Sequence, residues 1–196
     1  MSKDSTNKLN GKDLINIGIF SAIYFVIVGA ASMVGYIPVL YPMISIIVPL
    51  LGGIPFMLFL TKVKKPGMIF IMSVLMGILM ILTGMGFYPL LVSLVTGVIA
   101  EFIYKSGDYK SSKKAVLTYA VFGIWMWGNF LLLFINPTGY WATRQDFGQE
   151  YIDALTKIMP IWMCPVLLVV TFLFGILGAL IGKALMKKHF KKAGIV

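Results

Sequence analysis

The chain is poor in the residue types that most enzyme active sites require. It contains one cysteine (Cys164), one histidine (His189) and only seven acidic residues among 196. A lone thiol forms no internal disulfide, and a single histidine provides neither a metal cluster nor a Ser–His catalytic pair. No Gly-x-x-x-x-Gly-Lys-Ser/Thr motif is present to bind a nucleotide phosphate. We therefore expect no catalytic activity, no metal and no cofactor.

Glu101 is the one acidic residue well inside an apolar run. It precedes Lys105 by four residues, the favourable order for an ion pair along a helix. We predict a surface pair between the two rather than a proton relay. Ion-coupled pumps usually carry buried carboxylates near the middle of the membrane, so the sequence gives little support for such coupling.

Charge is scarce overall, and apolar residues dominate. Only 12% of residues are charged, where soluble domains have about a quarter, and the hydrophobic content is 59% with a mean hydropathy of +0.93. A helix needs ~20 apolar residues to cross the ~30 Å hydrocarbon layer. We predict an all-α membrane protein, one domain over residues 1–196, with six transmembrane helices in a compact bundle. The predicted spans are 13–34, 40–61, 67–84, 87–104, 115–136 and 160–183.

The basic residues alternate between the connections. Fifteen of the 17 lie in the N-terminal tail, in residues 62–65, in residues 105–114 or in the C-terminal tail from Lys183. The positive-inside rule then places both termini in the cytoplasm of a multi-pass plasma-membrane protein. Lysines spread over several turns favour contact with anionic lipid rather than with nucleic acid, which would need a basic stripe with exposed aromatic residues.

Small residues recur four apart in several spans, where they permit close approach of helix backbones. Packing within the bundle and docking of a partner are both consistent with this spacing. The pairs are Gly18 and Ala22, Ser73 and Gly77, and Ser93 and Gly97, and a related glycine face in the sixth span holds Gly175, Gly178 and Gly182.

The fifth span carries a polar stripe that could bind a ligand. At 100° per residue, Trp125, Asn129 and Asn136 fall at about 0°, 40° and 20° around the helix. An aromatic ring with two amides suits a flat, polar small molecule. Two other interpretations stay open: Trp125 packs internally, and Asn136 caps the helix before Pro137.

The longest connection, residues 137–159, is predicted to lie outside the cell and holds Tyr140, Trp141 and Arg144. Loops of this length are usually functional lids or disordered, and this one is aromatic enough to be ordered. We expect a lid over an outward cavity, although aromatic residues also form interfacial belts. Tyr88, at another exterior turn, has the same two interpretations. The candidate substrate-binding residues are therefore Trp125, Asn129, Asn136, Tyr140, Trp141, Arg144 and Tyr88.

Four segments together resemble a known family. They are Leu9-Asn10-Gly11-Lys12-Asp13-Leu14-Ile15, Leu51-Gly52-Gly53-Ile54-Pro55-Phe56, Leu82-Thr83-Gly84-Met85-Gly86 and the closing run Leu185 to Val196. With six predicted spans and both termini inside, the chain resembles the substrate-binding S components of energy-coupling factor (ECF) transporters. The resemblance is strongest to the branch called the Trep_Strep or MptD-like membrane proteins.

The resemblance implies a subunit that captures a vitamin-like or other scarce small molecule from outside the cell. Such a subunit works with a transmembrane coupling (T) subunit and, through it, with two cytoplasmic ATP-binding subunits. The family docks on its T subunit through an Ala-x-x-x-Ala motif on the first helix. The matching positions here are Gly18 and Ala22, so the first alanine is replaced by a still smaller residue.

Two alternatives of a different class remain. One is a stand-alone facilitator or secondary transporter, whose uptake would survive the loss of all ECF ATPases. The other is a non-catalytic membrane protein that assembles or regulates a partner, which would hold no ligand. The sequence identifies neither the substrate nor whether the T subunit is shared or dedicated.

Overall fold

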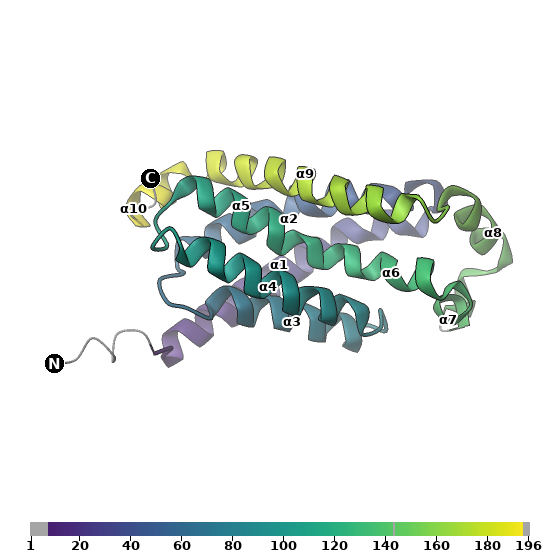
Figure 1. Cartoon of the computed structure of the whole chain (residues 1–196), viewed down its shortest axis with the longest axis horizontal. Coiled ribbons are helices and arrows are strands. Elements are labelled where there is room, and N and C mark those ends of the chain that lie inside the picture. The colour runs from purple at the N-terminus through teal and green to yellow at the C-terminus, as the bar shows by residue number, and fades with distance from the viewer. Residues whose placement is uncertain (1–7, 143, 194–196) are drawn as a thin grey trace.

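The computed structural model describes residues 8–142 and 144–193, which form an all-helical bundle. The predicted all-α class is confirmed. Figure 1 shows that α1 begins, and α10 ends, at the same end of the bundle, while α7 and α8 lie at the other end. Lys3 of the N-terminal tail and the last three residues of the closing run, which entered the sequence analysis, lie outside the described residues.

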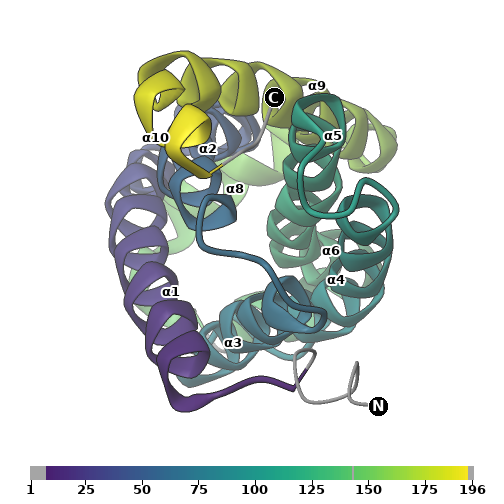
Figure 2. The same cartoon turned by 90° about the vertical axis from the view of Figure 1, so that its left-hand side faces the viewer.

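Six long helical stretches run along the bundle, and short helices connect them. Neighbouring helices contact one another in a ring, in the order α1, α2, α9, α5, α4, α3 and back to α1 (Figure 2). The main helices are α1 (Gly11–Ser32), α2 (Ile44–Leu60), α3 (Met68–Leu82), α4 (Tyr88–Lys105), α5 (Ser112–Phe122), α6 (Gly128–Ile135) and α9 (Met163–Leu185). The shorter elements are η1 (Met33–Tyr36), η2 (Pro38–Met43), η3 (Gly123–Trp127), α7 (Pro137–Ala142), η4 (Gln145–Phe147), α8 (Gln149–Ile158) and α10 (Lys187–Ala193).

Among the described residues, five stretches are long and apolar enough to cross a membrane: Gly11–Tyr36, Pro38–Leu60, Tyr88–Lys105, Ser112–Ile135 and Met163–Leu185. The third predicted span is different, because α3 has only 15 residues. At 1.5 Å per residue it covers roughly 22 Å, less than the ~30 Å hydrocarbon layer. It ends before a turn in which Gly84 and Gly86 have φ of 78° and 85°, a conformation that favours glycine.

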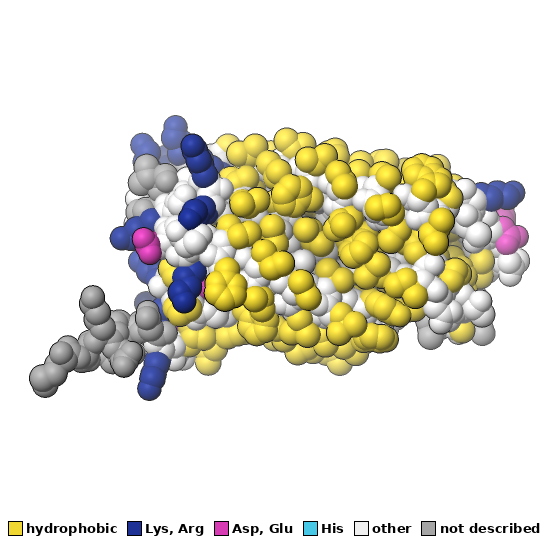
Figure 3. All heavy atoms as spheres, viewed as in Figure 1, with side chains coloured by type: hydrophobic (Ala, Val, Ile, Leu, Met, Phe, Trp, Pro, Cys, Tyr) yellow, Lys and Arg dark blue, Asp and Glu magenta, His cyan; other side chains and the backbone are white. Residues whose placement is uncertain are grey.

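On the face shown in Figure 3, most of the basic side chains gather at one end of the molecule and apolar side chains cover the flank. Lys157 lies in α8, at the other end. Lys12, Lys62, Lys64, Lys65 and Lys192 line one polar recess of about 510 Å³ at the lysine-rich end. The start of α1, the α2–α3 turn and the end of α10 therefore meet there, as the alternation of lysine-rich connections predicts. Which side of a membrane this end faces stays a prediction.

The ends of α1 and α3 at this side are held by acidic side chains. Asn10 and Asp13 form a capping box at the start of α1, and Lys65 Nζ forms a salt bridge with Asp13 Oδ2 at 2.7 Å. Glu101 Oε2 accepts hydrogen bonds from the backbone N–H groups of Ile69 (3.0 Å) and Phe70 (3.3 Å). Because a helix N-terminus attracts negative charge, Glu101 caps α3. The predicted surface pair with Lys105 is not formed.

Glycines bring α2 and α9 into backbone contact. A Cβ atom built on Gly178 would overlap the carbonyl oxygen of Pro49 and lie 2.9 Å from Leu50 Cα. A Cβ built on Gly182 would lie 2.6 Å from the Gly53 carbonyl oxygen. In the α3–α4 pair, Ser73 Oγ donates to the Ser93 carbonyl at 2.7 Å. The glycine face of the sixth span and the serine–glycine pairs therefore serve packing within the bundle.

Candidate functional site

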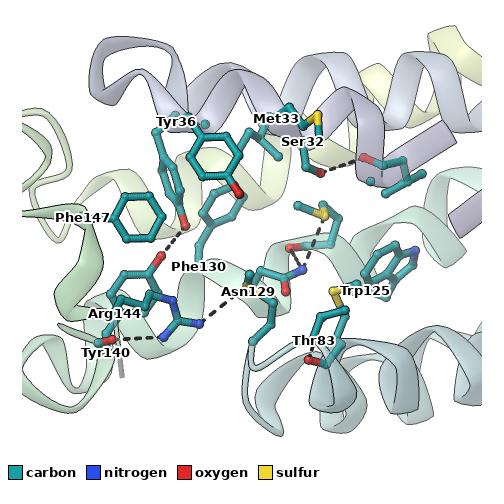
Figure 4. Close-up of a pocket in the computed structure, with 18 of the residues that line it drawn as sticks. Ser32, Met33, Tyr36, Thr83, Trp125, Asn129, Phe130, Tyr140, Arg144 and Phe147 are labelled. Atoms are coloured by element: carbon teal, nitrogen blue, oxygen red, sulfur yellow. Dashed lines mark hydrogen bonds between the residues drawn. The ribbon is translucent and has the colours of Figure 1, made fainter. Parts of the chain in front are cut away.

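A cavity of about 280 Å³ lies at the end of the bundle where α7 and α8 are found, away from most of the lysines. Figure 4 shows it in close-up. Its walls come from the end of α1, from η1 and η2, from the α3–α4 turn, from the broken helix around Trp125, and from the segment 137–159. Aromatic and methionine side chains make up most of the lining. The lining includes Met33, Gly35, Tyr36, Tyr41, Met80, Met85, Trp125, Met126, Asn129, Phe130, Tyr140, Trp141, Arg144, Phe147 and Tyr151.

The fifth helical stretch, Ser112–Ile135, lines this cavity at the point where its helix changes type. It consists of α5, the 3₁₀ segment η3 and then α6. A 3₁₀ turn advances about 120° per residue rather than 100°, so the predicted helical stripe is not continuous. Trp125 lies within η3 and Asn129 in the first turn of α6, and both line the cavity.

Hydrogen bonds orient both of these side chains. Trp125 is fully buried and its Nε1–H donates to Tyr24 Oη at 3.3 Å. Asn129 Nδ2 donates to the carbonyl oxygen of Met126 at 3.0 Å, one turn earlier. Asn129 Oδ1 is buried and has no hydrogen-bond partner among the described residues. The wall around Trp125 is thus ordered, and it contains one buried acceptor, Asn129 Oδ1, that has no partner among the described residues.

The segment 137–159 folds as α7, η4 and α8 and covers the open end of the cavity. Three side chains join it to separate parts of the bundle. Tyr140 and Tyr41 share a hydrogen bond between hydroxyl groups at 2.8 Å, and the Tyr151 hydroxyl donates to the Gly35 carbonyl. The ring of Phe147 stacks on Tyr36 with centroids 5.9 Å apart. This arrangement is that of a cover held by a few side-chain contacts.

Arg144 makes a fourth attachment of this cover. Its guanidinium donates to the Gly84 carbonyl at 3.1 Å and to the Tyr140 carbonyl at 3.0 Å. The same group lies 4.1 Å from the centroid of the Tyr140 ring, close enough for a cation–π contact. Arg144 therefore ties the cover to the α3–α4 turn and brings a positive charge to the cavity wall.

The two tyrosines of the cover remain protonated at neutral pH. Burial raises the pKa of Tyr140, and burial together with the nearby Tyr140 raises the pKa of Tyr151 to about 12. A phenol is an O–H donor only while it is protonated. The Tyr151 hydroxyl consequently keeps the proton that it donates to the Gly35 carbonyl at neutral pH.

Five of the seven predicted site residues line this one cavity: Trp125, Asn129, Tyr140, Trp141 and Arg144. Asn136 and Tyr88 do not belong to its lining. The stripe loses Asn136 because α6 ends at Ile135, and the Asn136 Oδ1 accepts the Gly139 N–H at 2.9 Å, which caps α7. Tyr88 begins α4, and its ring stacks on Phe87 with centroids 4.5 Å apart.

Sequence reasoning did not assign several lining residues. The sequence around Tyr41 could have indicated it, since Tyr41 lies between two prolines in a stretch too irregular for a regular membrane helix. Tyr151 belongs to the same aromatic-rich connection as Tyr140 and could have been included on that ground. The methionines of the lining carry no comparable signal, because 13 methionines are spread along the chain.

The chain matches one family model over residues 11–192, that of a hypothetical bacterial integral membrane protein family (Trep_Strep). The protein belongs to this family. The match spans all the main helices and the cover, so an integral membrane role applies to the whole bundle. No curated protein and no solved structure matches the chain.

Proposed function

We propose that this Trep_Strep protein is the substrate-capturing S component of an energy-coupling factor importer in the plasma membrane, with both termini in the cytoplasm. The observation that carries the proposal is the covered cavity at the end of the bundle away from most of the lysines. If the positive-inside rule holds, that end faces the outside of the cell. A ligand would then enter from outside and be enclosed by the segment 137–159.

The outer face of α1 also supports the proposal. Gly18 and Ala22 are exposed, and a Cβ built on Gly18 meets nothing within 4 Å. The other small-residue pairs are used inside the bundle, whereas this one is open. Small side chains allow another membrane helix to approach closely. This face is therefore where we propose that the T subunit docks.

The partners would supply the energy for transport. In this proposal the chain binds its substrate without catalysing a reaction, and two ATP-binding subunits act on it through the T subunit. A facilitator is the second candidate function, because a covered cavity alone is compatible with either. It is disfavoured by the open small-residue face, which a stand-alone carrier would not need.

The test is purification of the tagged chain from its own membranes in mild detergent, followed by mass spectrometry of bound proteins and metabolites. We expect a T-type membrane subunit, two ATPases and a small molecule. Uptake of that molecule should stop when the ATPases are deleted. Uptake that continues without them would establish a facilitator, and recovery of neither ligand nor ATPases would favour an assembly or regulatory role.

A further inference from the structure

Asn129 is distinguished from other buried polar residues by its position in the cavity. Four buried side-chain oxygens lack a hydrogen-bond partner within the described part of the chain: Ser21 Oγ, Ser112 Oγ, Asn129 Oδ1 and Thr171 Oγ1. Of these residues, Asn129 is the one that lines the cavity, and only 7% of its surface is exposed. Buried polar groups in native proteins almost always have a hydrogen-bond partner. We therefore expect a donor from outside the described residues to pair with this oxygen.

The neighbouring backbone determines which amide atom is available. Asn129 Nδ2 lies 3.0 Å from the Met126 carbonyl oxygen and 3.4 Å from Met126 Sδ. Turning the amide over would bring its oxygen against that carbonyl oxygen, and two acceptors repel each other. The amide atom without a partner is therefore the acceptor, and a ligand that reaches it must supply an N–H or an O–H.

The size of the cavity limits the ligand. An engineered apolar cavity of ~150 Å³ holds benzene, and the cavity here has about 280 Å³. That volume suits two fused rings. Trp125 and Phe130 provide flat aromatic walls, which favour a planar ligand. Flexible methionine side chains adjust to irregular shapes, so they can move aside for a ligand donor that approaches the buried oxygen. Those in the lining are Met33, Met80, Met85 and Met126.

The charge of the lining selects against cations. Arg144 is the one charged residue among the described residues of the lining, and no carboxylate faces a ligand there. A cation transferred from water into an apolar site pays a large desolvation cost unless an opposite charge compensates it. Arg144 would add repulsion, whereas an anionic substituent near it would be attracted.

We propose that the cavity selects a neutral or anionic molecule with two fused rings, whose N–H or O–H group donates a hydrogen bond to Asn129 Oδ1. The inference rests on the proposed function only in taking the cavity as the site of the transported molecule. It names Asn129 as the residue that determines specificity. It also assigns the discrimination between anions and cations to Arg144.

Four small probes test the roles of Asn129 and Arg144, by isothermal titration calorimetry on the purified full chain in detergent. Indole and benzofuran have nearly the same shape, but only indole carries an N–H. We expect indole to bind at least about tenfold more tightly, since an unpaired buried acceptor weakens the complex. Indole-3-acetate and tryptamine compare charge on a common ring system, and we expect the anion to bind at least about tenfold more tightly than the amine.

The variant Asn129→Leu should remove the preference for indole, leaving indole and benzofuran within about twofold of each other. The matched control is Asn16→Leu, which removes an amide at the lysine-rich end of the bundle and should keep the preference. If Asn129→Leu does not fold, the comparison of indole with benzofuran on the unaltered chain decides the question.

The inference would be overturned by any of three results. Indole and benzofuran could bind equally, neither could bind, or tryptamine could bind more tightly than indole-3-acetate. None of these measurements involves a T subunit or an ATPase. Failure here would leave the importer proposal standing, and uptake independent of ATPases would leave the ligand inference standing. The two proposals can therefore fail separately.

Discussion

The α2–α9 interface and the outer face of α1 contain the same kind of residue and use it in opposite ways. At the interface, Gly53 and Gly178 touch through their backbones. On α1, Gly18 and Ala22 point away from the bundle, and the space around Gly18 is open. Small residues four apart therefore show only that a helix can be approached closely. The surrounding fold decides whether a helix of the same chain makes that approach.

The interface is built from more than small side chains. Lipid provides no hydrophobic force between helices, so packing and hydrogen bonds must hold them together. Tyr119 of α5 donates its hydroxyl to the Pro49 carbonyl at 2.8 Å, next to the contact with Gly178. Gly52 also leaves room for that hydroxyl, since a Cβ there would lie 2.7 Å from Tyr119 Oη. No such set of contacts surrounds Gly18.

The largest effect on stability is expected for Gly178→Ala. The new methyl group would overlap the Pro49 carbonyl oxygen, and backbone cannot rotate away as a side chain can. We expect a loss of at least about 3 kcal/mol in the free energy of unfolding, the upper range for overpacking. Size-exclusion chromatography and thermal unfolding in detergent measure it. The control Gly18→Ala should cause no loss and can gain up to about 1 kcal/mol, because alanine favours a helix more than glycine does. An equal loss in the two variants would refute the comparison.

A smaller loss is expected for Gly77→Ala in the α3–α4 pair. Its Cβ would lie 2.5 Å from Ser93 Oγ and 2.6 Å from Leu90 Cα. The hydroxyl can turn aside, but the backbone must shift slightly, so about 1–3 kcal/mol should be lost. The same unfolding measurement applies. An unchanged midpoint would mean that α3 is free to move away from α4.

The variant Ser73→Ala should have a still smaller effect, because it removes one hydrogen bond and adds no atoms. Ser73 Oγ donates to the Ser93 carbonyl across the same pair at 2.7 Å. A typical hydrogen bond contributes about 0.5–1.5 kcal/mol, so the midpoint should fall measurably but less than for Gly77→Ala. The reverse order would show that polar contact, rather than close approach, holds this pair together.

The sequence predicted the helices better than it predicted their interruptions. Apolar runs and lysine-rich turns indicate membrane helices and their alternation, because both depend on composition. The stripe argument placed Asn136 in the cavity because it assumed one regular helix, whereas η3 interrupts that helix and α6 ends at Ile135. Glu101 was paired with Lys105 along its own helix, whereas its partners are the N–H groups of Ile69 and Phe70 on α3. Contacts between distant segments leave no periodic signal in a single sequence.

On the outer face of α1 we predict the opposite result to that for Gly178→Ala: stability is kept and a partner is lost. Ala22→Trp adds a large side chain to an exposed position, so the free energy of unfolding should change by less than about 0.5 kcal/mol. If the T subunit docks there, uptake and recovery of the ATPases should be lost, while ligand binding by the isolated chain is kept. Leu177→Trp, on the exposed side of α9, is the matched control and should keep uptake. Normal uptake by Ala22→Trp would show that the open face of α1 contacts only lipid, and spacing alone would then have suggested a partner where none binds.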